Sequence, residues 1–119
     1  MTEVIDWDQL ESLSELQEPG EPDLVEGLIA SFVGDGRPRM TRIAAAISKC
    51  DCAATRMEAH TLKGSAAQLG AGPLAEAAER LEHAAYAGDT ERLPALAEEL
   101  ARSMELALAA LANPPFRHP

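Results

Sequence analysis

The sequence is poor in β-branched residues and has neither a long apolar run nor a targeting signal. Val, Ile and Thr together supply 12 of the 119 residues against 38 Ala and Leu, which favours helix over strand. No stretch approaches the ~20 apolar residues of a membrane span. The first residues, Met-Thr-Glu-Val-Ile-Asp-Trp-Asp, are acidic and lack the basic start of a signal peptide. We therefore expect a soluble, cytoplasmic helical protein.

Basic residues and cysteines are also scarce. Ten Lys and Arg stand against 20 Asp and Glu, and a formal net charge of −10 makes nucleic acid and anionic membrane poor partners. Cys50 and Cys52 are too close for an ordinary disulfide, so we expect them to be small packing residues. No phosphate-binding GxxxxGK[ST] segment is present, which predicts that the chain has no nucleotide site of its own.

Glycine, proline and capping residues divide the chain into five helical patterns. The first is short, and the four that follow have narrow apolar stripes and short connections. The predicted fold is all-α, an antiparallel four-helix bundle with a short extra N-terminal helix packed across it. We expect a single, free-standing, monomeric domain over residues 1–113. Residues 114–119, which include His118, are expected to form a tail.

Several helix ends and one interruption are predicted from local signals. Asp6 followed by Gln9 predicts a capping box, Pro22 suits the first turn of the second helix, and Asp89 or Thr90 is expected to cap the last helix. The Gly34–Pro38 segment interrupts the second helical pattern. Its apolar positions nevertheless keep helical phase, so we expect one long helix that is kinked or loosened at Pro38. These positions are 25, 29, 33, 36, 40, 43 and 47.

His60 is the histidine with distinctive neighbours. The expected helix from Asp51 to Gly70 has an apolar stripe at residues 59, 62, 66 and 69, and His60 lies about 160° to 200° from Leu62 and Leu69, facing water. Lys63 and Gly64 lie one turn along on the histidine's own face. Gly64 costs a helix interior about 1 kcal/mol relative to alanine, which leaves two explanations: clearance for a partner's backbone, or a close approach between two helices.

The turn after this helix predicts a partner for the histidine. The reversal centres near Ala71, and residues 60 and 82 both lie 11 positions from it. In an antiparallel helix pair they should therefore lie at the same level along the helix axes. Glu82 lies beside the core position 81 and could accept a hydrogen bond from Nδ1–H of His60, leaving Nε2 outward. Glu79 and Tyr86 share the face of Glu82. No acid occurs from residue 59 to 75.

Two other interpretations remain open from the residues alone. A surface histidine with a nearby lysine and glutamate is most often ordinary solvated surface. A metal site could instead use Cys50, Cys52, His60 and His83. The C-x-C pair lies at the start of a helix, far along the helix axis from His60, and this separation is unfavourable for a zinc site. We therefore expect no metal site.

Residues 60–70 decide between these interpretations. Their sequence, His-Thr-Leu-Lys-Gly-Ser-Ala-Ala-Gln-Leu-Gly, resembles the signature of histidine-containing phosphotransfer (HPt) domains, H-x-L-K-G-[SA]-x-x-x-[LI]-G, at every fixed position. The resemblance extends to the Leu81-Glu82 pair and to the five-helix layout, from about Ile5 to Leu111. The Gly34–Pro38 segment departs from the family by one extra glycine.

The resemblance implies a phosphocarrier of a multistep two-component phosphorelay, without kinase activity. His60 would carry a phosphoryl group between the aspartates of receiver domains in response regulators and hybrid histidine kinases. Lys63 would neutralise phosphate charge, Gly64 would give access, and Glu82 would orient the imidazole. No cofactor of its own is expected, and Mg²⁺ should come with the receiver. The candidate docking residues at the rim are Thr61, Ser65, Ala67, Gln68, Glu79 and Tyr86.

One alternative function stays open beside the phosphocarrier. A helical interaction module could bind a response regulator or kinase without accepting phosphate. Such a module has no need of a histidine at position 60, where this chain has one.

Overall fold

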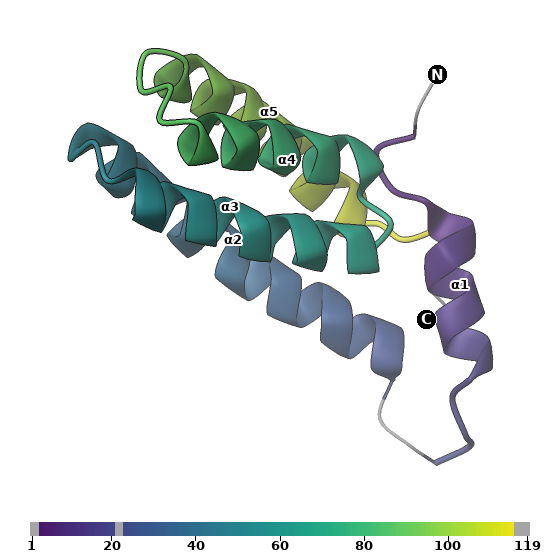
Figure 1. Ribbon diagram of the computed structural model, residues 1–119. Helices are drawn as coiled ribbons and strands as arrows, with labels where there is room; N and C mark the ends of the chain where they lie inside the picture. Colours follow the sequence, from purple (N-terminus) through teal and green to yellow (C-terminus); the bar gives the residue numbers. More distant parts are fainter. Residues whose placement is uncertain (1–2, 21–22, 116–119) are drawn as a thin grey trace.

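The computed structural model describes residues 3–20 and 23–115, and its helices agree with the predicted all-α class. No strand occurs in these residues. Pro22 and the tail residues 116–119, with His118, lie outside the described part. The five helices are α1 (Trp7–Glu15), α2 (Leu24–Ser48), α3 (Cys52–Gln68), α4 (Gly72–Tyr86) and α5 (Leu93–Leu111) (Figure 1).

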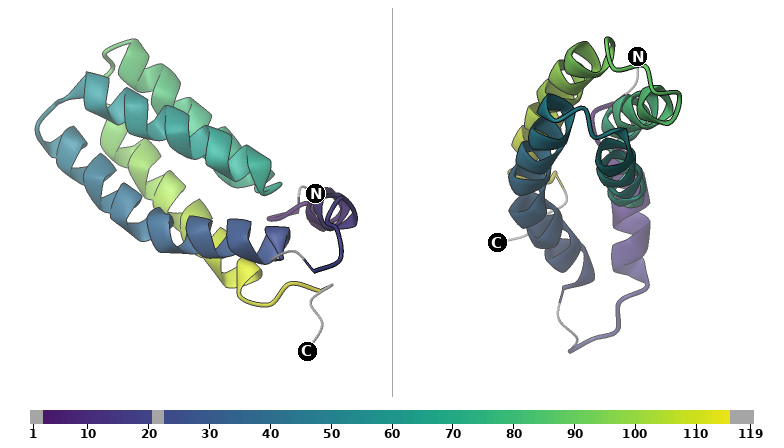
Figure 2. Two further views of the ribbon diagram at one scale, coloured as in Figure 1. Left: turned by 90° about the horizontal axis from the view of Figure 1, so that it is seen from below. Right: turned by 60° about the vertical axis from the view of Figure 1, so that its left-hand side comes forward.

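Helices α2 to α5 form the bundle, and α1 lies across one end of it (Figure 2). Helix α3 makes its most extensive contact with α4 and also packs on α2, whereas α5 lies diagonally across the bundle from α3. The apolar stripes of the helices meet in one core whose largest members are leucines and a methionine. Burying each such side chain contributes about 1.5–3 kcal/mol. The predicted bundle with a short crossing helix is confirmed. In the described part, no helix is long and apolar enough to cross a bilayer.

Helix α2 continues through Pro38, as predicted. Gly36 is buried there, and a Cβ on it would lie 3.1 Å from Sδ of Met104, so this glycine lets α5 approach closely. The apolar stripe of α2 differs from the prediction at one step. Phe32 is buried and Val33 is 40% exposed, because the helix turns its Phe32 side toward the core.

The capping box predicted at Asp6 is only half present. The Asp6 side chain accepts a hydrogen bond from the Gln9 backbone N–H at 3.2 Å. The Gln9 side chain does not return to Asp6. Its Nε2 donates to the carbonyls of Ala67 and Gln68 at 2.8 and 3.0 Å. These carbonyls lie in the last turn of α3, where the regular helical donors four residues on are missing. Gln9 therefore ties α1 to the end of the helix that carries His60.

Three helices end in the same hydrogen-bond pattern, and this explains their short connections. In α3, Gly70 N–H donates to Ala67 O and Ala71 N–H to Ala66 O, with Gly70 at φ +73°. Helix α4 ends the same way at Gly88, and α2 ends so at Cys50, which adopts φ +54°.

The predicted caps of α5 are wrong. Asp89 N–H closes the end of α4 by donating to Ala84 O. The residue that precedes α5 is Arg92, without a side-chain cap, and Pro94 lies in the first turn.

Gly70→Ala is predicted to destabilise the protein by about 2 kcal/mol or more. The left-handed conformation costs an alanine about 1–2 kcal/mol, and its Cβ would lie 2.9 Å from the Asp6 carbonyl oxygen, where α1 begins. The free energy of unfolding from urea titration measures the effect. Gly27→Ala is the matched control, because this helical glycine faces open space and the change should stabilise by about 0.5–1 kcal/mol. Equal effects at both positions would contradict the structural role of Gly70.

Candidate functional site

His60 lies on the outer face of α3, with 66% of its side chain exposed. The reason is the apolar stripe of this helix: Ala59, Leu62 and Ala66 are fully buried, which turns the intervening face outward. The prediction that His60 faces water is confirmed.

The imidazole is held by a carboxylate from the next helix. His60 Nδ1 lies 2.7 Å from Glu82 Oε2. Leu81 is buried in the core, so Glu82 stands on the flank of α4, with 13% of its side chain exposed. An ionised carboxylate can only accept hydrogen bonds, so Nδ1 is the donor, and in the neutral imidazole Nε2 is the nitrogen with the lone pair. The contact predicted from the turn is therefore present.

Lys63 shares this carboxylate. Its Nζ lies 2.8 Å from Glu82 Oε1, an ion pair that sequence reasoning missed. The hydrogen bond from Lys63, and then that from His60, lower the pKa of Glu82 against the opposing effect of burial. The pKa of Lys63 is raised, chiefly by its bond to Glu82.

The lowered pKa keeps Glu82 ionised well below neutral pH. The contacts of the ionised Glu82 contribute to the free energy of unfolding at pH values above the pKa of a glutamate in the unfolded chain. That contribution is lost as the pH falls through the lower native value. The site thus places the Glu82 carboxylate between the Lys63 ammonium and the His60 imidazole.

Gly64 leaves the helix surface bare next to His60. A Cβ at this position would meet no atom within 4 Å. A close approach between helices therefore does not explain this glycine, and that interpretation is wrong. The remaining explanation is clearance above the backbone, which an external group could use.

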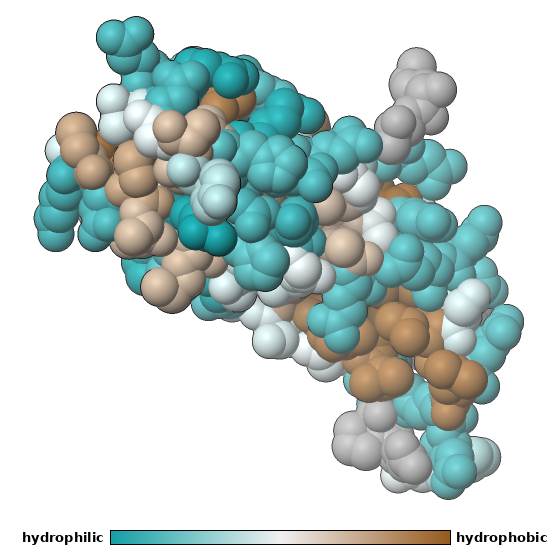
Figure 3. All heavy atoms as spheres, in the orientation of Figure 1, coloured by the Kyte–Doolittle hydropathy of each residue, from teal (hydrophilic) through white to brown (hydrophobic). Residues whose placement is uncertain are grey.

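The predicted docking residues lie on several sides of this centre. Thr61, Ala67, Gln68, Glu79 and Tyr86 are exposed. Ser65 is half-buried, lies about 140° round the helix from His60, and lines a hollow between α3 and α2. Apolar surface gathers elsewhere, at the α1 end of the molecule, where Leu13, Leu24 and Leu28 line a groove (Figure 3).

Arg56 is the site neighbour that the sequence reasoning missed. Its guanidinium carbon lies 4.5 Å from the centroid of the Tyr86 ring, a favourable cation–π distance. The count from the turn would have found it, because residues 56 and 86 both lie 15 positions from Ala71.

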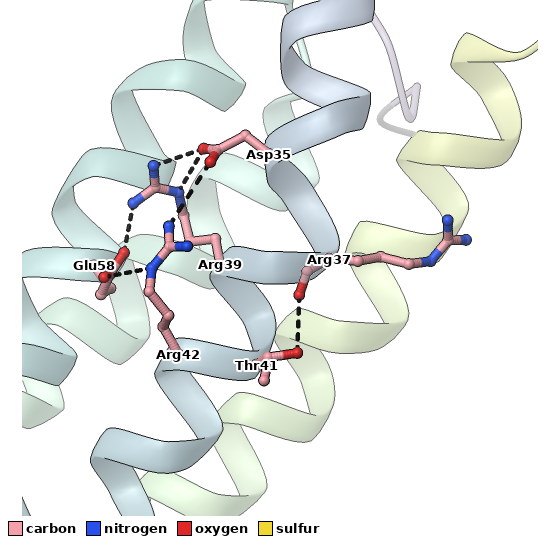
Figure 4. A network of polar contacts seen from close by, with 6 residues as sticks. All are labelled: Asp35, Arg37, Arg39, Thr41, Arg42 and Glu58. Atoms are coloured by element: carbon pink, nitrogen blue, oxygen red, sulfur yellow. Dashed lines mark hydrogen bonds and ion pairs between the residues drawn. The ribbon is translucent and has the colours of Figure 1, made fainter.

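The arginines on the other side of α3 are neutralised. Arg39 contacts Asp35 at 2.6 Å and Glu58 at 2.5 Å, and Arg42 contacts Glu58 at 2.9 Å. Figure 4 shows this network bridging α2 and α3, with Arg37 directed the other way, toward α5. These side chains therefore contribute no unpaired positive charge to the His60 face.

The cysteines and the other described histidine form no metal site with His60. Among the described residues, no three His, Cys, Asp or Glu side chains are grouped to hold a metal ion. Cys52 packs partly against the core as predicted. The same prediction is wrong for Cys50, which is exposed in the turn after α2. His83 is exposed beside Glu79, at 3.9 Å.

Known proteins are similar to this chain in sequence and in the arrangement of the helices. The sequence model of the Hpt domain family matches residues 27–113. The solved structure of histidine-containing phosphotransfer protein B (HptB) from Pseudomonas aeruginosa PAO1 matches with a TM-score of 0.85 and 31% identity, over 94% of each chain. A comparison with curated proteins finds no match. The family match spans α3 and α4 with His60, Lys63, Gly64 and Glu82, and the chain belongs to the Hpt family.

Proposed function

We propose that this protein carries a phosphoryl group on Nε2 of His60 between the aspartates of receiver domains in a phosphorelay. The observation that carries the proposal is the 2.7 Å contact of Nδ1 with Glu82 on an exposed ring. This contact fixes the tautomer, so the nucleophilic nitrogen is the one that faces a visiting protein. The bare backbone at Gly64 gives that visitor room.

The transfer depends more on correct positioning of the imidazole and the phosphoryl group than on covalent catalysis by other residues. The Nε2 lone pair attacks phosphorus in line, the acyl P–O bond breaks, and the receiver aspartate leaves as a carboxylate. The proton stays on Nδ1, and Glu82 offsets the positive charge that the ring gains. In the reverse step the carboxylate of the next receiver attacks the phosphorus, and the neutral imidazole leaves. Mg²⁺ is expected on the receiver.

Lys63 supplies the positive charge nearest to the phosphoryl group. It lies one helical turn after His60, and its ammonium can donate to a phosphoryl oxygen while Glu82 remains close. The phosphoryl group itself carries close to two negative charges. The ion pair with Glu82 therefore holds the Lys63 ammonium in place before the phosphoryl group arrives.

The phosphate donors and acceptors in this proposal are proteins. We propose a monomeric, cytoplasmic carrier for receiver domains. The absence of a GxxxxGK[ST] segment, a common ATP-binding motif, fits this proposal. An interaction module that binds a regulator without accepting phosphate is the competing function. His60 and its bond to Glu82 favour the carrier, because simple binding requires no oriented nucleophile.

His60→Gln is predicted to abolish labelling. After incubation with a ³²P-labelled receiver, the wild-type protein should acquire a label that survives base and is lost in acid, as a phosphoramidate does. The amide of glutamine cannot act as the nucleophile, so the variant should stay unlabelled on a neutral gel. His83→Gln, a change to the exposed neighbouring histidine, should label normally. A label that persists in His60→Gln would overturn the assignment.

Glu82→Ala is predicted to slow transfer by about tenfold, the worth of a hydrogen bond to a charged group. Without the carboxylate, Nδ1 loses its acceptor, and ¹⁵N NMR of the imidazole should show both tautomers in place of one. The fold should remain, because Glu82 lies outside the apolar stripe. Glu105→Ala is the matched control, since it breaks another cross-helix ion pair, to Arg37. An unchanged tautomer ratio in Glu82→Ala would contradict the orienting role.

Gly64→Ala is predicted to stabilise the protein and slow its reaction. A methyl group meets open space here, so the free energy of unfolding should rise by about 0.5–1 kcal/mol. The methyl group would occupy the clearance beside His60, so transfer to a receiver should slow. Urea titration and single-turnover transfer measure the two effects. Gly27→Ala should stabilise similarly at an unchanged transfer rate, and an equal rate in Gly64→Ala would refute the access role.

A further inference from the structure

Arg56 is unusual among the arginines because it has no carboxylate partner. Within residues 3–20 and 23–115, most arginines form ion pairs with Asp or Glu, and Arg56 and Arg102 are the exceptions. In a chain of net charge −10, an exposed cation without a counter-charge leaves local positive potential. That potential lies one turn before His60, on the same face of α3.

The Arg56 side chain is also held in place. Its guanidinium stacks over Tyr86 at 4.5 Å, and the Tyr86 ring is 72% exposed. A stacked guanidinium keeps its N–H donors free at its edge, since the ring occupies only one face. Because α4 sets the position of Tyr86, Arg56 loses little side-chain freedom when it makes a further contact.

The charge around His60 is therefore unequal along the helix pair. Beyond His60 in the chain direction, Lys63 is paired with Glu82, and Glu79 adds an exposed negative charge. Before His60 stands Arg56, with no acid in contact. A partner with negative charge is attracted to the Arg56 end of the site.

A receiver brings negative charge to this place. Its reacting group is an aspartate, and the Mg²⁺ that it is expected to carry requires oxygen ligands, commonly carboxylates. On a chain of net charge −10, a surface that carries carboxylates docks most favourably beside a local positive group. Arg56 supplies one on this chain, and its planar donors fit a carboxylate in bidentate geometry.

We propose that Arg56, held against Tyr86, forms an ion pair with a carboxylate on the docking surface of the receiver that exchanges phosphate with His60. The contact sets the orientation and strength of docking and does not act on the phosphoryl group. This inference rests on the proposed function and names a recognition residue for it.

The test compares a reaction that needs a receiver with one that does not. Receiver domains of the source organism are phosphorylated with acetyl phosphate, and the one that transfers fastest to the wild-type protein is used. Arg56→Gln should raise KM for this receiver about threefold to tenfold at low salt and leave kcat unchanged. The difference should shrink at about 0.5 M salt, where charges are screened. Labelling of His60 by phosphoramidate, a small donor, should proceed at the wild-type rate.

Three further variants sharpen the result. Arg102→Gln removes the other arginine of the described residues that lacks a carboxylate partner. It lies on α5, diagonally across the bundle from α3, so the change should have no effect. Arg56→Lys keeps the charge without the planar stack and should fall between wild type and Arg56→Gln. Tyr86→Leu should raise KM in the wild-type background but add little to Arg56→Gln, because both changes remove the same positioned cation.

The outcomes separate this inference from the function on which it rests. An unchanged KM in Arg56→Gln, with normal wild-type transfer, overturns the ion pair and leaves the carrier function intact. A slowed phosphoramidate reaction in Arg56→Gln also overturns it, because Arg56 would then act on the imidazole or the phosphoryl group. If no receiver labels the wild-type protein, the carrier function and the ion pair fall together.

Discussion

The register of α3 against α4 is the constraint on which the site depends. Gly70 in its left-handed conformation and the buried Ala71 reverse the chain in so few residues that the two helices cannot slide past one another. Positions at equal distance from Ala71 then face each other. This register places Glu82 beside His60 and Tyr86 beside Arg56. A change of one residue in the turn would rotate α4 by about 100° and separate both pairs.

The charges within this register are arranged around one carboxylate. Glu82 accepts from His60 through one oxygen and contacts Lys63 through the other. Each cationic or donor neighbour favours the ionised form of Glu82, and its pKa falls accordingly. The site is therefore organised before any partner binds, so little reorientation remains for the reaction. The salt bridges between α2 and α3 have a different role. They hold the two helices together and leave no unpaired charge (Figure 4).

Glycines serve this bundle in separate ways, and only the structure distinguishes them. Gly36 lets α5 approach α2, and Gly70 adopts a backbone conformation that suits few other residues. Gly64 does neither, because its surroundings are open. In the sequence Gly36 lies in phase with an apolar stripe, Gly64 lies on the face of His60, and Gly70 lies at the end of a helix. The difference between a packing glycine and an access glycine depends on which neighbours surround the backbone, and these come from helices distant in sequence.

The amino-acid pattern was enough to predict the helical class, the order of the helices, the outward direction of His60 and its pairing with Glu82. Apolar periodicity and the position of one tight turn are local properties, and they suffice for those conclusions. Three contacts could be recognised only in the packed bundle: Lys63 shares the Glu82 carboxylate, Gln9 binds the end of α3, and Arg56 stacks on Tyr86. The physical reason is that long side chains choose among several partners within reach, and their choice depends on the distances between packed helices.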